Sequence, residues 1–337
     1  MTAPKKLGQQ SVKFSNPPVI SAWASIVGPK EGQGPWAKDF DKILADYLYG
    51  QSSWEKAENS ILQEAVHTAA AKAGFDAGDV ELLLAGDLLN QIISANYAAR
   101  QLNIPFLGLY GACSTMAESL LLAAMLTEAG FFERVVAATC SHHYTAERQY
   151  RNPVEQGIQS SLSSQWTATA AGAILVQPGG NGPRITCATV GKVVDMGVTD
   201  PANMGAAMAP AAGSTIKAHF EDTQRTTDYY DLVVTGDLGS IGANLASQIF
   251  IQQGLMPPPN YSDCGVLLYD GLPDIKSGAS GCGCSAAMLC GPLLKKMSRG
   301  EINRLLFVAT GALMSPTSTF QGESIPGIAH AIAIENV

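Results

Sequence analysis

The sequence is poor in charged residues, which make up 15% of the chain against 46% for hydrophobic residues. Acidic residues outnumber basic ones, 29 to 21, and leave a formal net charge of -8 at pH 7. Lysine and arginine form no cluster, whereas binding to a phosphate backbone needs a basic face. We therefore expect no nucleic-acid partner, and a small molecule or another protein instead. The high hydrophobic content also excludes a disordered chain.

Long apolar runs are missing as well. No run reaches the roughly 18 residues that a membrane-spanning helix needs, and the polar residues 1–10 lack the apolar stretch of a secretory signal. We expect a soluble protein of the cytosolic compartment. The seven cysteines are odd in number and irregularly spaced, so in this reducing compartment we expect free thiols and no disulfide framework.

Several segments of the first half return in the second, offset by roughly 150 to 170 residues. Most copies are short apolar runs that end in a turn, as buried strands of a parallel sheet do. Four pairs occur in the same order: residues 82–88 with 232–238, 111–114 with 283–285, 134–139 with 304–310, and 171–176 with 329–334. Four matches in one order predict an internal duplication.

The two halves meet in residues 177–183, where proline and glycine break every regular pattern. We predict an N-terminal half over residues 1–180 and a C-terminal half over residues 181–337. Predicted strands alternate with amphipathic helices, such as residues 54–73 and 214–220. This alternation indicates an α/β fold in which helices cover mainly parallel sheets.

Cys113 directly follows the strand-like residues 106–110 and precedes a helix that begins near Ser114. Backbone N–H groups and the dipole at a helix N-terminus stabilise a thiolate, so we expect a lowered thiol pKa. The same groups stabilise an acyl oxyanion. Cys113 is therefore a candidate nucleophile or ligand contact, and a small buried cysteine that only fills space is the alternative.

A Gly-Ala-Cys-Ser turn after an apolar strand resembles the nucleophile turn of thiolases and ketoacyl synthases. Within that superfamily, the chain resembles the stage V sporulation protein AD family of spore-forming Firmicutes, which is not enzymatic. The runs that carry this resemblance lie in both halves. They are residues 84–91, 111–115, 145–149, 207–212, 280–282, 284–286 and 328–330.

The resemblance implies a thiolase-like, internally duplicated, five-layered αβαβα fold with two mainly parallel mixed sheets, assembled as a homodimer. It also implies a non-catalytic protein that binds dipicolinic acid (pyridine-2,6-dicarboxylate), free or as its calcium chelate, for uptake into the developing spore. Other stage V sporulation A membrane proteins are the implied partners. Through them the protein would associate peripherally with the cytoplasmic side of the spore inner membrane. No cofactor is implied besides calcium that accompanies dipicolinate.

The alternative is an acyltransferase or thioesterase of the ketoacyl synthase III or thiolase kind that uses Cys113. That chemistry needs an imidazole near the thiolate and a second oxyanion donor. Where ketoacyl synthases have a His-Gln-Ala-Asn-like turn, residues 236–239 read Gly-Asp-Leu-Gly, and residues 270–289, where thiolases have Gly-His-Pro, contain no histidine. Ser324 stands where thiolases have a second cysteine. An ionised Asp237 would oppose an oxyanion, so we predict that Cys113 is vestigial.

The chain has only five histidines. His142 and His143 follow a predicted strand at the end where parallel sheets place their ligand sites, so one of them is expected in the pocket. His330 lies in or near the last strand and is a further ligand candidate, with a satisfied core histidine as the alternative. His67 and His219 are expected to be surface or capping residues.

A rigid aromatic diacid needs cations or N–H groups for its carboxylates and an aromatic wall for its ring. Arg148 and Arg151 are candidates because a guanidinium grips a carboxylate in two places. The alternative for Arg148 is a surface pair with Glu147 or a contact with a dimer partner. Trp166 and Tyr144 are candidate walls. The predicted ligand-binding residues are Cys113, His142, Tyr144, Arg148, Arg151, Trp166, Asp237, Cys284 and His330.

Metal binding is weakly indicated. Asp195, Asp200 and Asp237 are oxygen donors for calcium if the chelate binds, although no helix-flanked calcium loop is present. The cysteines at 282, 284 and 290 lack the paired spacing of common zinc sites. We therefore predict no metal site that belongs to the protein itself.

Overall fold

The computed structural model describes residues 5–150 and 161–337, and its main strands form two halves with the same internal order. The first half runs β6 (Phe106–Gly108), β5 (Leu82–Gly86), β7 (Val135–Ser141), β9 (Ala170–Gln177) and β3 (Val19–Val27). The second runs β12 (Tyr261–Asp263), β11 (Leu232–Thr235), β14 (Arg304–Ala312), β15 (Gly327–Glu335) and β10 (Arg184–Thr189). The halves join edge to edge at β3 and β10, where Val19 pairs with Arg184.

In each half four of these strands point the same way and one opposes them. β9 runs antiparallel to its neighbours β3 and β7, and β15 runs antiparallel to β10 and β14. The repeated sequence segments occupy equivalent places, since β5, β7 and β9 correspond to β11, β14 and β15. The boundary predicted at residue 180 falls in the loop between β9 and β10, and the division into two domains stays a prediction.

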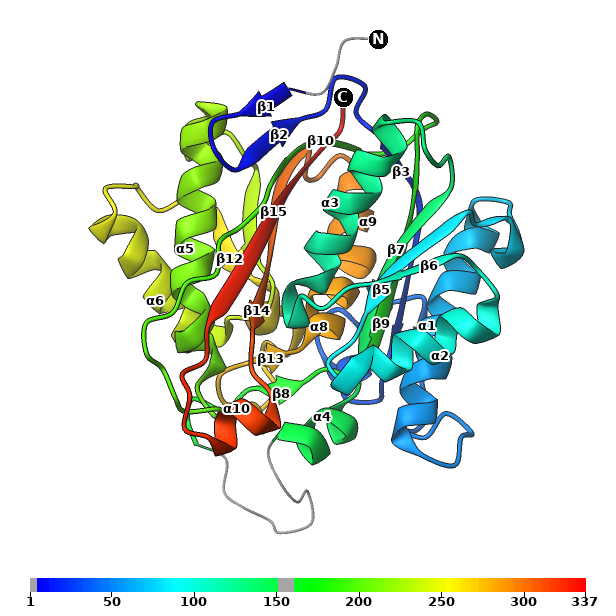
Figure 1. Ribbon diagram of the computed structural model, residues 1–337, viewed down its shortest axis with the longest axis horizontal. Coiled ribbons are helices and arrows are strands. Elements are labelled where there is room, and N and C mark those ends of the chain that lie inside the picture. The colour runs from blue at the N-terminus through cyan, green and yellow to red at the C-terminus, as the bar shows by residue number, and fades with distance from the viewer. Residues whose placement is uncertain (1–4, 151–160) are drawn as a thin grey trace.

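Helices cover both faces of each half, as Figure 1 shows. α1 (Trp54–Lys72) and α2 (Ile93–Leu102) lie on the outer face of the first half, and α5 (Met204–Thr223) and α6 (Gly239–Gln252) lie outside the second. α3 (Thr115–Glu128) and α8 (Cys282–Met288) contact strands of both halves from between them. The five-layered αβαβα arrangement that the family resemblance implies is confirmed.

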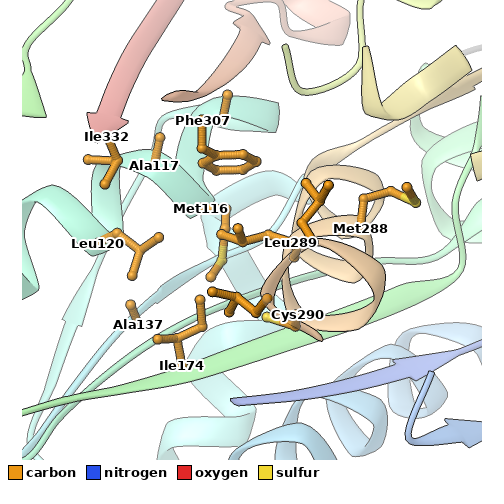
Figure 2. Packing of buried hydrophobic residues seen from close by; sticks show 14 of the residues in the cluster. Met116, Ala117, Leu120, Ala137, Ile174, Met288, Leu289, Cys290, Phe307 and Ile332 are labelled. Carbon is orange, nitrogen blue, oxygen red and sulfur yellow. The ribbon is translucent and has the colours of Figure 1, made fainter. Parts of the chain in front are cut away.

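The central layer carries the largest hydrophobic core, part of which appears in Figure 2. Met116 and Leu120 of α3 face Leu289, which follows α8, while Ile174 of β9 and Phe307 of β14 close the core from the two halves of the sheet. All of these side chains are fully buried. α8 continues through a π-helical turn (Leu289–Leu293) that accommodates a proline, and then through α9 (Leu294–Ser298).

Short elements surround the ends of the main strands. α4 (His143–Tyr150) follows β7, α7 (Cys264–Leu268) follows β12, and α10 (Pro316–Phe320) lies between β14 and β15. β8 (Trp166–Thr167) pairs with β13 (Ala279–Ser280). Within residues 5–150 and 161–337, no helix combines the length and the apolar character needed to cross a bilayer.

Candidate functional site

Cys113 lies in a tight turn between β6 and α3. The turn places Ala112 at a left-handed φ of 49°, a conformation that residues other than glycine adopt rarely and that recurs at functional sites. The hydroxyl of Ser114 donates to the carbonyl of Gly111 at 2.7 Å, and that of Thr115 donates to the carbonyl of Ala112 at 2.6 Å. These bonds fix the turn and leave the side chain of Cys113 buried.

The carboxyl group of Asp237, at the end of β11, interacts with the Cys113 thiol. It also accepts hydrogen bonds from the backbone N–H of Gly281 and the hydroxyl of Thr310, both at 2.8 Å. Burial, with the nearby Asp237 as a second cause, raises the pKa of the Cys113 thiol well above its usual value. The lowered thiol pKa predicted from the helix terminus is therefore wrong.

Three histidine rings bond to groups other than the Cys113 thiol. Nε2 of His142 lies 2.8 Å from the carbonyl of Tyr47, and burial lowers the pKa of this imidazole to about 4. Nδ1 of His330 accepts a hydrogen bond from the N–H of Gly191 at 3.1 Å. His219 is fully buried between the hydroxyls of Thr189 and Tyr230, so the surface or capping role predicted for it is wrong, whereas His67 is exposed as expected.

Two adjoining spaces lie in front of this turn. The inner cavity has a volume of about 40 Å³ and is lined by Leu88, Ala112, Cys113, Ala146, Tyr150, Thr167, Pro201, Met204, Ser280, Gly281, Ala312 and Met314. The outer groove measures about 500 Å³ and is lined by residues 87–92, Tyr110, Ala112, Tyr150, residues 312–315 and Ser318. A drug-sized ligand typically occupies about 300 to 1,000 Å³, so the groove fits such a ligand and the cavity does not.

The outer groove contains Asp87, the residue after β5. Its carboxylate accepts hydrogen bonds from the N–H groups of Leu89 and Ala95, both at 2.7 Å, and these bonds fix the start of α2. Burial nevertheless raises the pKa of Asp87 to about 6. The groove therefore carries a negative charge on its wall at neutral pH.

The aromatic residues predicted to hold a ligand lie in a cluster beside α4 instead. Tyr144 stacks on Trp54 with ring centroids 4.6 Å apart, and Trp166 stacks on His143 at 3.8 Å. The ammonium of Lys30 lies over the ring of Trp166, 4.4 Å from the ring centroid. Neither Tyr144 nor Trp166 is among the described residues that line the cavity or the groove, and their contact with a ligand stays a prediction.

The two predicted arginines differ in what the structure describes. Arg148 is half-exposed, forms an ion pair with Glu55 at 3.0 Å and packs over Trp54 at 4.7 Å. It lines a side pocket of about 360 Å³ that shares Leu89 and Asn90 with the outer groove. Arg151 lies outside the described residues.

The remaining candidates are not brought together. Cys284 is buried in the central core, where its sulfur lies 3.6 Å from the carbonyl of Gly236. Asp195 binds the N–H of Gly197 and the hydroxyl of Ser324. The carboxylate of Asp200 accepts a hydrogen bond from the nearby N–H of Ala202. In the described part of the chain, no three side chains of the metal-binding types meet.

Two groove residues are absent from the predicted ligand-binding set, although their positions after predicted strands could have indicated them. Asp87 and Tyr110 come soon after β5 and β6, at the carboxyl ends of parallel strands, where α/β sheets place their ligand sites. Tyr150 carries no such signal, because its position depends on how α4 packs. None of the described residues that line the groove belongs to the predicted ligand-binding set.

Known proteins resemble this chain in sequence and in structure. The family described as stage V sporulation protein AD matches residues 8–335. The stage V sporulation protein AD of Bacillus subtilis is 45% identical over 331 residues, which cover 98% of each chain.

Solved structures with this fold include 3-oxoacyl-[acyl-carrier-protein] synthase III from Aquifex aeolicus, with a TM-score of 0.60 and 11% identity over 95% of this chain and 100% of the other. OleA from Xanthomonas campestris has a TM-score of 0.61 and 12% identity over 98% of this chain and 100% of the other. At this identity the likeness shows the thiolase-like fold alone. The match along almost the whole sequence shows more: the chain belongs to the stage V sporulation protein AD family.

Proposed function

We propose that this protein binds dipicolinic acid in the outer groove, for uptake into the developing spore, and catalyses no reaction. The observation that carries the proposal is the state of Cys113. Its thiol is buried beside the carboxyl group of Asp237, in a cavity of about 40 Å³, while a groove of about 500 Å³ lies directly in front of it. Membership of a sporulation family supports the biological setting.

Apart from Asp87, the described side chains that line the groove are neutral, and several of them suit an aromatic diacid. Tyr110 and Tyr150 provide ring faces, and the side-chain amides of Asn90 and Gln91 and the hydroxyl of Ser315 are donors. Ten-residue α2 begins at this groove, but the N–H groups of Ser94 and Ala95 in its first turn already bind the carboxylate of Asp87. The tyrosine rings and the neutral side-chain donors are therefore the groups that can hold the ligand ring and bond to its carboxylates.

A cation for the dianion has to come from the side of the groove. Among the described lining residues of the groove there is no lysine or arginine. Arg148 lines the adjoining side pocket, which shares Leu89 and Asn90 with the groove. We assign one carboxylate of the ligand to this guanidinium, in competition with Glu55.

The state of Cys113 argues against acyl transfer. Only a thiolate attacks a thioester efficiently, and burial holds the pKa of this thiol well above its usual range. An ionised Asp237 beside it also opposes a developing oxyanion. An acyltransferase or thioesterase that uses Cys113 remains the rival function because the turn and the fold are those of a condensing enzyme.

The proposal includes a homodimer and membrane-protein partners of the stage V sporulation A group. Among the strands that the structure describes, β6 pairs with β5 alone, and Leu107 and Tyr110, on or beside β6, are 50% and 61% exposed. An apolar edge strand is a template for a second copy of the same strand. Contact with the spore inner membrane would then run through protein partners on its cytoplasmic side.

Isothermal titration calorimetry with dipicolinic acid tests the proposal, with pyridine-2-carboxylate and benzene-1,3-dicarboxylate as matched controls. We expect binding of dipicolinic acid and at least about tenfold weaker binding of the monoacid, because one carboxylate contact is lost. Absence of heat with dipicolinic acid at millimolar concentration, with and without calcium, would refute it. A stable acyl adduct on Cys113 after incubation with acyl-CoA would establish the rival function instead.

A further inference from the structure

The cavity at Cys113 and the outer groove are neighbours with a common boundary. Five lining residues belong to both spaces, namely Leu88, Ala112, Tyr150, Ala312 and Met314. Cys113 lines only the cavity, and its side chain is 5% exposed. Any molecule that moves from the groove to the thiol has to pass these five residues.

Tyr150 is the largest of the five and the only aromatic one. It is the last residue of α4, and its hydroxyl donates a hydrogen bond to the carbonyl of Leu88. Leu88 follows β5 and, like Tyr150, lines both spaces. The phenol is therefore held at its far end by another residue of the boundary, as well as by its own backbone.

Neighbouring contacts hold α4 in this position. The side-chain amide of Gln149 binds the same loop twice, since its N–H donates to the carbonyl of Leu88 at 3.0 Å and its oxygen accepts from the N–H of Asn90 at 2.9 Å. One turn earlier, the hydroxyl of Thr145 donates to the buried carboxylate of Glu58 at 2.7 Å. The ring of Tyr150 is thus fixed by a helix that is fastened on both sides.

We propose that Tyr150 is a plug that closes the Cys113 cavity against the outer groove, so that a ligand in the groove rests on the phenol ring and does not reach the thiol. The closure itself stands on the contacts above, and only the identity of the ligand rests on the proposed function. The role makes Tyr150 a specificity-determining residue. A flat ring of the size of pyridine dicarboxylate stays in the groove, and a thioester cannot approach the sulfur.

Thiol labelling of the full chain tests the plug. Methyl methanethiosulfonate, a small neutral reagent, is applied to the wild type, Tyr150→Ala and Tyr150→Phe, and the modified cysteines are quantified by peptide mass spectrometry. The readout is the labelling rate of Cys113 divided by that of Cys290, which is fully buried in the central core. Because unfolding exposes both cysteines alike, it cannot by itself raise the rate of Cys113 relative to that of Cys290.

We expect Tyr150→Ala to raise this ratio at least about tenfold, because the access of the reagent to the Cys113 thiol then no longer limits the reaction. Tyr150→Phe keeps the ring and should stay within about twofold of the wild type. A ratio in Tyr150→Ala equal to that of the wild type overturns the proposal, whether labelling is slow or fast.

The same samples separate this proposal from the proposed function. If dipicolinic acid gives no heat with the wild type while the ratio rises in Tyr150→Ala, the ligand is wrong and the plug stands. If dipicolinic acid binds and the ratio does not change, the plug is wrong and the ligand stands. Binding together with a raised ratio supports both.

Discussion

The carboxyl group of Asp237 lies against the thiol of Cys113, although 123 positions separate them along the chain. Both groups are buried, so a charge on either one is poorly solvated and raises the cost of charging the other. Burial raises the pKa of Asp237 to about 7, against the hydrogen bonds from Thr310 and Gly281 that favour its ionised form. The site is therefore most stable with an uncharged thiol and, below neutral pH, an uncharged acid.

This arrangement predicts how stability depends on pH. The folded pKa of Asp237, about 7, exceeds its value of 3.8 in the unfolded chain, so the wild type loses stability as pH rises between these values and not above about 7. Asp237→Asn removes that loss. The gain of the variant over the wild type should grow by roughly 2 to 3 kcal/mol between pH 5 and pH 8.

Urea unfolding followed by circular dichroism at several pH values measures this change. The quantity compared is the slope of the free energy of unfolding against pH. The asparagine also alters a hydrogen bond, but this shifts the free energy by an amount that does not depend on pH. Asp274→Asn, at an exposed position, is the matched control and should parallel the wild type. A difference between Asp237→Asn and the wild type that is constant over this pH range would contradict the prediction.

Local sequence patterns were enough to predict sheets covered by helices and the Cys113 turn, whereas the five layers followed only from the family resemblance. The apolar runs of β5, β7, β11 and β14 are fully or almost fully buried. Continuous apolar runs of this length are typical of strands in a parallel sheet that helices cover on both faces. The repeated segments then predicted two equivalent halves. These features depend on residues that are close together in the sequence.

The chemistry of the site depends on residues that are far apart in the sequence, and local patterns predict little of it. The helix terminus at Cys113 favours a thiolate, but complete burial outweighs it. His219 lies beside acidic residues in the sequence, yet its ring faces Thr189 and Tyr230 inside the second half. Neither burial nor these partners can be deduced from neighbouring residues, because both follow from how the elements pack.

Arg148 is predicted to contribute to ligand affinity and little to stability. Arg148→Met should weaken dipicolinic acid binding about tenfold, because it removes a charge-assisted contact. It should change the free energy of unfolding by less than about 1 kcal/mol, since the pair with Glu55 is solvent-exposed. Calorimetry and urea unfolding of the same sample give both values.

Glu55→Gln is the matched control for Arg148→Met, because it breaks the same ion pair and leaves the guanidinium in place. Its affinity for dipicolinic acid should equal or exceed that of the wild type, since the ligand no longer competes with a carboxylate. Unchanged affinity in Arg148→Met would remove this arginine from the site.

Calcium alone is predicted not to bind tightly. Asp195 and Asp200 are engaged in local turns, Asp237 is buried, and the described residues bring no three metal-binding side chains together. Millimolar calcium without dipicolinic acid should therefore leave the thermal unfolding temperature unchanged. A calcium chelator should likewise change the affinity for dipicolinic acid by less than about twofold. A rise of several degrees in the thermal unfolding temperature with calcium alone would contradict this prediction.

At the edge of the first half, β6 has β5 as its single partner among the described strands. A lysine there places charge in the strand edge and prevents pairing with a second copy. We expect the wild type to sediment as the proposed dimer in analytical ultracentrifugation and Leu107→Lys to sediment as a monomer. Ile251→Lys, near the end of α6, is the control because Ile251 is an apolar residue with 66% exposure, compared with 50% for Leu107. It should remain dimeric. A Leu107→Lys variant that sediments as the wild type does would place the dimer contact elsewhere, because a buried lysine at a paired edge is strongly unfavourable.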